Sequence, residues 1–174
     1  RPLCKKYIGN RYLAWLNDRD VTRFMETGIV RVTRRDLEAF CEKIIKSETD
    51  EMFVIIIKRN DMHIGNIKLG GINWRHGYGN LGVMIGEKRY WGKGYAQEAC
   101  KLLLDYAFNT LYLNKVTLGV HGSHIAAIRA YRKIGFKIEG RIKNLLSCEG
   151  RYVDKVIMGL SNREFNKLKA PSKI

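Results

Sequence analysis

The chain has 174 residues, of which 45% are hydrophobic and 28% charged, so it is long enough for one soluble domain with a core and short for two. Its net charge of +15 predicts attraction to anions and repulsion of polycations, and residues 61–174 hold 19 of the 32 Lys and Arg but only 8 of the 17 Asp and Glu. The longest apolar run, 52–57, is too short to cross a bilayer as a helix.

The four cysteines are scattered, without a CxxC pair or a histidine at metal-binding spacing. Cys41 and Cys100 fall within helical patterns, where a buried free thiol behaves as a small hydrophobe. The sequence therefore favours reduced cysteines in a cytoplasmic protein, and it predicts neither a disulfide framework nor a metal site.

The first half of the chain predicts two helices followed by three strands. Apolar residues at helical spacing indicate a helix over 7–17, and Thr33 is placed to cap a second helix whose buried stripe ends near Ile45. Asn60-Asp61 predicts the turn between the first two strands, and 70–77 is expected to be a loop. β-branched and apolar residues place the strands at 51–58, 63–69 and 78–86.

The second half predicts alternating helices and strands and then a hairpin. The longest helix is expected over 92–109, and Gly135 is expected to end a later one as its C′ residue. A polar, basic tail is expected from residue 163. The remaining elements are a strand at 115–120, a helix at 125–134 and hairpin strands at 136–146 and 152–160. This order predicts an α+β structure, and we expect residues preceding Arg1 to add another strand.

A glycine-rich turn, Trp91-Gly92-Lys93-Gly94-Tyr95-Ala96, joins the third strand to the longest helix. Glycines permit tight backbone conformations and close approach of a ligand. The first N–H groups of a helix have no internal partner, and with the helix dipole they form an anion site, to which Lys93 adds charge. The string is neither a P-loop nor a Rossmann fingerprint, which requires a third glycine. We therefore predict that this turn binds a pyrophosphate.

A second motif at 124–136 reads His-Ile-Ala-Ala-Ile-Arg-Ala-Tyr-Arg-Lys-Ile-Gly-Phe. Together the two segments resemble the Gcn5-related N-acetyltransferase (GNAT) superfamily. Its phosphate motif, Gln/Arg-x-x-Gly-x-Gly/Ala, maps onto 91–96. Its second cofactor motif maps onto His124, Ala127, Tyr131, Lys133, Gly135 and Phe136. The leading Trp91 and the end pattern at 150–154 look most like the RimJ/RimL-like subfamily that acetylates ribosomal-protein N-termini, although other members of that subfamily differ in specificity.

The resemblance implies a single α+β domain of the GNAT type, in which a mixed central sheet is splayed at the cofactor strand and flanked by helices. Residues 1–50 would form acceptor-side helices, 51–136 the sheet and acetyl-CoA core, 137–160 a C-terminal hairpin and 161–174 a basic tail. The implied cofactor is acetyl-CoA. Its expected contacts are main-chain groups of Met84 and Ile85 together with Trp91, Gly92, Lys93, Gly94, Tyr95, Ala96, His124 and Lys133.

Two positions depart from the pattern of the superfamily. Trp91 lacks the charge of the usual Arg and the amide group of the usual Gln, so backbone amides and Lys93 must bind more of the phosphate. His124 stands where Asn usually reaches the pantetheine arm. It either forms that hydrogen bond or only caps its helix.

The reaction that the resemblance implies is direct attack of a neutral amine on the acetyl thioester. Tyr131 aligns with the usual acid for the departing thiolate, and a phenol with a pKa of about 10 is protonated at neutral pH. The alternative for Tyr131 is a core aromatic. Asn80 stands where related enzymes often have Glu, and it can orient a water or the acceptor but cannot take a proton. The other candidate bases are His63, His76 and Glu87, and a water chain is the alternative to all of them.

The acceptor is expected to enter beside residues 7–35, the 70–78 loop and the 145–153 part of the hairpin. Trp15, Trp74 and Tyr152, together with Phe24, are candidate wall residues, and each is equally consistent with ordinary packing. The competing acceptors are a protein or peptide N-terminus, an amino sugar, and a polyamine or cationic antibiotic. The positive charge disfavours this third class unless acidic residues line the pocket.

Functions other than catalysis are also consistent with the charge. A basic surface would suit proximity to the ribosome. A different class of function is a non-catalytic RNA- or ribosome-binding module, suggested by Lys and Arg interleaved with Tyr at 129–137 and 151–155. No membrane partner is expected, and the oligomeric state is left open.

Overall fold

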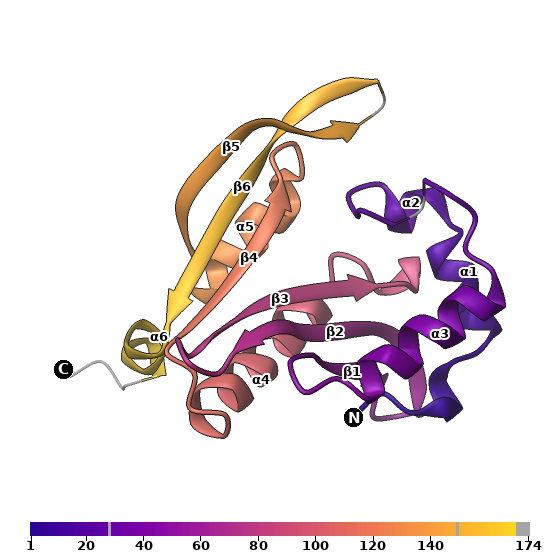
Figure 1. Cartoon of the computed structure of the whole chain (residues 1–174), viewed down its shortest axis with the longest axis horizontal. Coiled ribbons are helices and arrows are strands. Elements are labelled where there is room, and N and C mark those ends of the chain that lie inside the picture. The colour runs from indigo at the N-terminus through magenta and orange to yellow at the C-terminus, as the bar shows by residue number, and fades with distance from the viewer. Residues whose placement is uncertain (28, 149, 170–174) are drawn as a thin grey trace.

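Six strands form one sheet at the centre of the protein: β1 (Glu51–Ile57), β2 (Met62–Asn73), β3 (Tyr78–Ile85), β4 (Lys115–His121), β5 (Lys137–Cys148) and β6 (Arg151–Ser161). The computed structural model describes residues 1–27, 29–148 and 150–169. The strand order is β1-β2-β3-β4-β6-β5, and all neighbours are antiparallel except β3 and β4 (Figure 1). This mixed sheet with flanking helices confirms the predicted α+β class.

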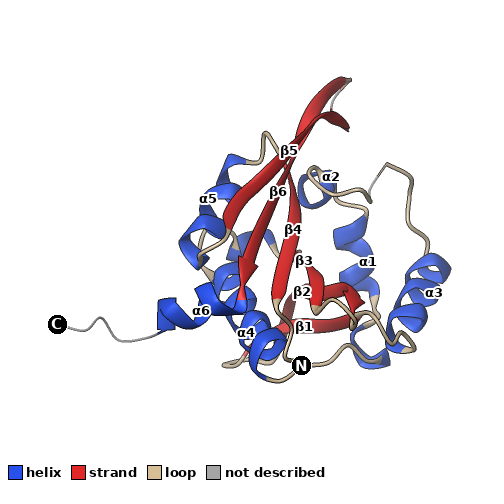
Figure 2. Cartoon of the chain, turned by 60° about the vertical axis from the view of Figure 1, so that its left-hand side comes forward, coloured by secondary structure: helices blue, strands red, loops and turns tan. Residues whose placement is uncertain are grey.

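The helices cover the two faces of the sheet in separate groups (Figure 2). One group consists of α1 (Asn10–Leu16), α2 (Arg19–Thr22) and α3 (Arg34–Ile45). The other consists of α4 (Tyr95–Asn109), α5 (Ile125–Ile134) and α6 (Asn162–Lys169). Two short 3₁₀ helices, η1 (Lys5–Tyr7) and η2 (Lys88–Tyr90), lie in connections. None of the helices in the described part of the chain has both the length and the apolar character needed to cross a membrane.

The core lies in two clusters on opposite faces of the sheet. The larger cluster joins the sheet to α4, whose Leu103, Leu104 and Ala107 recur at helical spacing and are buried. The smaller cluster joins α1 and α3 to the other face, through residues such as Trp15 and Leu37. Each fully buried Leu contributes about 1.5–3 kcal/mol, so both helix groups are anchored to the sheet.

The parallel pair β3–β4 is hydrogen-bonded over a short stretch, and its strands then diverge. Pairing ends with Asn80 beside Thr117, although β3 continues to Ile85 and β4 to His121. Figure 1 shows β4 turning away from β3 toward the hairpin β5–β6. We call residues 81–85 of β3 and 118–121 of β4 the splay. This divergence of the strands agrees with the expected sheet, which is splayed at the strand before the glycine turn.

Several boundaries differ from the sequence prediction. β2 runs on through the expected loop to Asn73, because this segment pairs with β3 across a register shift near Gly71, whose φ is +57°. The long helix begins at Tyr95 rather than Gly92. The expected tail contains α6, because Phe165 is buried against Phe108 with ring centroids 5.3 Å apart. The expected tail beyond residue 169 lies outside the described residues.

The start of the chain lies against β1. The backbone N–H of Leu3 donates to Met52 O at 2.8 Å, and that of Val54 donates to Arg1 O at 2.8 Å. Pro2 and Phe53 form an isolated antiparallel bridge. The segment at Arg1 therefore extends the sheet at its β1 edge by a short pairing.

Candidate active site

The glycine turn after β3 faces open space. Gly92 and Gly94 have φ values of +69° and +82°, which favour glycine, and a Cβ built on Gly92 would meet nothing within 4 Å. Among the described residues, no acceptor receives a hydrogen bond from the backbone amides of residues 92–97. Because residues 95–97 form the first turn of α4 and residues 92–94 lead into it, the corner offers several free donors at a helix N-terminus. Its geometry fits a diphosphate, as the motif predicts.

Trp91 fastens this turn to the end of β3. Its indole Nε1 donates to Ile85 O at 2.7 Å, although the side chain is 42% exposed. Tyr90 and Tyr95, which flank the turn, meet edge to face with centroids 5.3 Å apart. These contacts hold the turn while its amides stay unpaired. Ala96 follows in the first turn of α4 and is half-buried.

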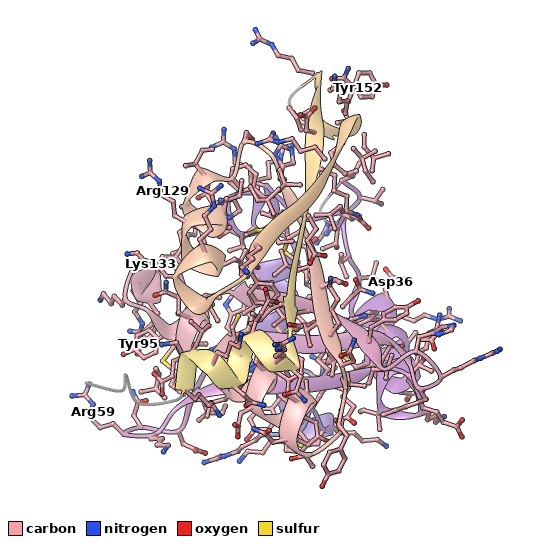
Figure 3. The ribbon with its side chains drawn as sticks, turned by 90° about the vertical axis from the view of Figure 1, so that its left-hand side faces the viewer. Asp36, Arg59, Tyr95, Arg129, Lys133 and Tyr152 are labelled. Carbon is pink, nitrogen blue, oxygen red and sulfur yellow. The ribbon has the colours of Figure 1, made fainter. Side chains whose placement is uncertain are left out.

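Positive side chains lie near the turn on two elements. Lys93 Nζ lies 6.0 Å from the centroid of the Tyr90 ring. The first turn of α4 is joined to α5 by Gln97, whose Nε2 donates to Ala130 O at 3.4 Å. Figure 3 shows Lys133 and Arg129 of α5 along the same side of the molecule as Tyr95. The two predicted cofactor motifs are therefore brought together, and their cations are positioned to attract phosphate.

The main-chain groups along β3 alternate between its two neighbours. Lys115 N donates to Gly77 O at 3.1 Å on the β4 side, whereas Gly86 N donates to Ile64 O at 2.9 Å on the β2 side. By this alternation the groups of Val83 and Ile85 face the splay, and those of Met84 face β2. The main-chain groups of Val83, rather than those of Met84, are therefore free for the expected contact with the cofactor. Ile85 also faces the splay, but its carbonyl accepts a hydrogen bond from Trp91.

Tyr131 lies on α5 and is half-buried against α4. Its ring meets Phe136 edge to face with centroids 5.8 Å apart. Burial, with a smaller effect of Cys100, raises the pKa of Tyr131 above its ordinary value, so the phenol keeps its proton. The side chain is thus a donor at all physiological pH values. Whether it acts as the acid stays a prediction at this point.

Asn80 lies at the closed end of the splay. Its Oδ1 accepts a hydrogen bond from Thr117 Oγ1 at 2.8 Å. Together the two residues line an open pocket of about 470 Å³ whose other lining residues are His76, Tyr78, Asn114, Lys115 and Glu139. Asn80 is therefore exposed on the same face of β3 as Gly82, and it can orient a ligand there.

Two of the other candidate bases are engaged on the α1 side. His63 is buried, and its Nε2 lies 3.0 Å from both Gly65 O and Asn66 Oδ1. Burial lowers the pKa of His63, and its ring packs against Trp15 with centroids 4.8 Å apart. Glu87 accepts from Trp15 Nε1 at 3.4 Å. His76, in contrast, is exposed in the connection before β3.

The candidate wall residues lie on separate elements. Trp15 is 5% exposed and belongs to the smaller core cluster. Trp74 is half exposed after β2, where its Nε1 donates to Glu48 O at 3.0 Å. Tyr152 is 72% exposed near the tip of the hairpin (Figure 3). The structure therefore does not gather these three side chains around one point.

Sequence reasoning gave no role to His121, the last residue of β4. Its side chain is 6% exposed, and its Nδ1 lies 2.8 Å from Ser123 Oγ. Phe24 covers it, with ring centroids 5.3 Å apart. Phe24 also stacks on His124 at 4.1 Å, and the His124 side chain makes no capping hydrogen bond to α5. Because side chains alternate along a strand, the sequence of β4 could have predicted that His121 lies on the same face as Thr117. It could not have predicted that β3 and β4 diverge beside His121.

Comparison with known proteins gives concordant matches. Residues 1–137 match the model of the acetyltransferase (GNAT) domain family. The chain is 29% identical over 86% of its length to the uncharacterized N-acetyltransferase p20 of Bacillus licheniformis and covers 84% of that protein. It is 30% identical over 75% of its length to spermidine N(1)-acetyltransferase of Escherichia coli and covers 68% of it. The crystal structure of spermidine N-acetyltransferase from Vibrio cholerae in complex with CoA and spermine superimposes with a TM-score of 0.88 at 25% identity, covering 95% of this chain and 96% of that one.

Proposed function

The chain belongs to the acetyltransferase (GNAT) family and is an acetyl-CoA-dependent N-acetyltransferase. We propose that its acceptor is the primary amine of a protein N-terminus or of an amino sugar. Its catalytic class excludes the alternative of a non-catalytic RNA- or ribosome-binding module. The first acceptor is supported by Trp91 and the 150–154 pattern, which look like those of enzymes that acetylate ribosomal-protein N-termini, whereas the relatives of named substrate are spermidine N-acetyltransferases. A nucleotide-linked amino sugar would suit the positive charge of the chain.

The choice of acceptor depends on the charges beside the splay. Three carboxylates near this face of the sheet each have a cationic partner, so a polycationic acceptor would have to displace a lysine to bind any of them. The pairs are Asp50 with Lys68 at 3.1 Å, Glu139 with Lys115 at 2.6 Å and Glu26 with Lys155 at 3.3 Å. Neither a peptide N-terminus nor an amino sugar requires such a displacement.

The residues of this chain divide the work between binding and proton transfer. Acetyl-CoA, when bound, supplies the acetyl thioester. The free amides of residues 92–97, with Lys93 and Lys133, would bind its diphosphate, and the main-chain groups of Val83 and Ile85 would hold the pantetheine arm. Tyr131 would donate its proton to the departing thiolate. Asn80 would orient the acceptor at the closed end of the splay.

A polyamine is the second candidate acceptor. It is favoured by the spermidine acetyltransferases among the relatives, one of them 30% identical to this chain. The net charge of +15 and the paired carboxylates oppose it. The two candidates make opposite predictions for one acceptor screen.

That screen measures release of the CoA thiol from acetyl-CoA in the presence of three amines: a peptide beginning with alanine, a nucleotide-linked amino sugar, and spermidine. We expect turnover with the peptide or the amino sugar and a much lower kcat/KM with spermidine. A higher kcat/KM with spermidine than with the other two would overturn the proposal and establish the polyamine. Omitting the amine gives the rate of thioester hydrolysis, which is the blank for all three.

A further inference from the structure

Two side-chain nitrogens in the described residues are buried without a hydrogen-bond partner, Asn66 Nδ2 and His121 Nε2. Unpartnered buried polar atoms are rare in native proteins, so each requires an explanation. Asn66 lies on β2, where it pairs in register with Met84 and is separated from the splay by β3. His121 lies on the splay itself, the part of the sheet where the thioester is expected.

The strand register places His121 relative to that site. Asn80 and Thr117 are the last partners of β3 and β4, and their side chains meet on one face of the sheet. Side chains four residues further along each strand return to that face. The corresponding residues are Met84 and His121. His121 therefore stands opposite the main-chain edge of Val83 and Ile85, across the splay and on the face from which an acceptor would enter.

Neighbouring side chains fix the imidazole and determine its charge. Ser123 Oγ holds Nδ1 at 2.8 Å, and when this hydroxyl accepts the Nδ1 proton, Nε2 carries a free lone pair. The charged and titratable groups around it are Arg23 after α2, His124 at the start of α5, and Lys155 of β6, which is paired with Glu26. Burial first, and then Arg23, lowers the pKa of His121 below 6.5, so the ring is neutral at pH 7.

We propose that His121 Nε2 is the base that accepts a proton from the acceptor amine, which gives the transferase a catalytic residue that the cofactor motifs do not contain. This inference rests on the proposed N-acetyl transfer. It does not depend on which amine is the acceptor. Phe24, whose ring covers both His121 and His124, keeps the imidazole dry, and its side chain would have to swing aside for the amine to reach the buried Nε2.

The proton balance of the step is complete. An ammonium acceptor gives one proton to His121 Nε2, and the neutral amine then attacks the thioester carbonyl carbon. The C–N bond forms, the C–S bond breaks, and the sulfur takes a proton from Tyr131. The second proton lost from nitrogen returns to Tyr131 through water, and His121 releases its own proton to solvent. The products are the acetylamide, the CoA thiol and one proton.

Two variants keep a polar atom in place of one ring nitrogen each and remove the base. His121→Asn keeps a polar atom near Nδ1 for Ser123, and His121→Gln places one near Nε2, but neither side chain takes a proton. We expect both to lower kcat/KM by roughly 10²–10⁴-fold, the usual range for general-base catalysis, and to remove the limb that rises with pH below 6.5 in the wild-type profile. Acetyl-CoA affinity and the thermal midpoint should match those of the wild type.

A third variant supplies a signature that a structural role would not give. In His121→Ala, added imidazole should restore part of the activity in proportion to its concentration. An unchanged pH profile in His121→Gln, or the absence of rescue in a folded His121→Ala, would overturn the proposal. These measurements use whichever amine of the three-amine screen is turned over fastest.

A readout without turnover keeps the inference separate from the proposed acceptors. Side-chain ¹⁵N spectra of the histidines, recorded at pH 7, should show His121 with a proton on Nδ1 and none on Nε2. Its Nε2 signal should move when acetyl-CoA is added. If none of the three amines reacts, the acceptor proposal fails and the spectra still decide on His121. A proton on Nε2, or a signal unaffected by the cofactor, contradicts the assignment.

Discussion

Trp91 shows how one side chain changes the chemistry of a phosphate turn. Its indole donates to the carbonyl of Ile85, which would otherwise end β3 without a partner. Because an indole carries no charge, it cannot neutralise phosphate. The charge must be met by Lys93, by Lys133 and by the free amides of the turn. The residue that departs from the family motif thus holds the turn in shape, and the proposed function assigns the binding to its neighbours.

Tyr131 gives the sharpest prediction at the residue scale. Tyr131→Phe removes the hydroxyl and keeps the ring that packs against Phe136. If this phenol protonates the departing thiolate, kcat should fall by roughly 10²–10⁴-fold. The change in kcat is measured by stopped-time assays of thiol release at saturating acetyl-CoA. The affinity for acetyl-CoA serves as the control and should change little. Wild-type turnover in Tyr131→Phe would show that the tyrosine is only a packing residue.

The elements that sequence reasoning located are those whose signals are local. The capping box of α3 and the left-handed Gly135 that ends α5 are both readable in a few consecutive residues. The extension of β2 through Asn73 and the formation of α6 around Phe165 depend on partners distant in the chain. The role of His121 was missed for the same reason, since it follows from the divergence of β3 and β4.

The capping box of α3 carries a prediction at this scale. Thr33 Oγ1 accepts from Asp36 N at 3.2 Å, and Asp36 Oδ2 accepts from Thr33 N at 2.8 Å. Thr33→Ala removes one of these bonds and should lower the free energy of unfolding by about 0.5–2 kcal/mol. Urea unfolding followed by circular dichroism measures the change. Thr33→Ser is the matched control, because it keeps the hydroxyl. An equal loss in both variants would show that the methyl group, and not the cap, stabilises the helix.

The sheet is organised as two halves whose strands, in the described residues, are joined by the short β3–β4 pairing. The half formed by β1–β3 carries α1 and α3, and the half formed by β4–β6 carries the long hairpin (Figure 1). Both halves remain packed to α4, α5 and α6 on the opposite face. The splay thus opens toward one face while the other stays closed by core. The cofactor and the acceptor can therefore meet between the strands without disturbing the main hydrophobic cluster.

The net charge of +15 predicts that binding of CoA weakens with salt. The cations beside the turn are exposed, and the Debye length falls from about 10 Å at 0.1 M to about 3 Å at 1 M. Calorimetric Kd values for CoA should therefore rise steadily with NaCl over this range. Lys133→Gln should raise the Kd at low salt by about two- to fivefold, as expected for one exposed ion pair, and should flatten the salt dependence.

Lys46→Gln provides the matched control for this measurement, because Lys46 ends α3 on the opposite face of the sheet. It removes the same charge from the molecule as Lys133→Gln and leaves the surroundings of the turn unchanged. Equal effects of the two variants would mean that only the net charge attracts the cofactor. A larger effect of Lys133→Gln would place the phosphate groups beside α5, to which Gln97 joins the first turn of α4.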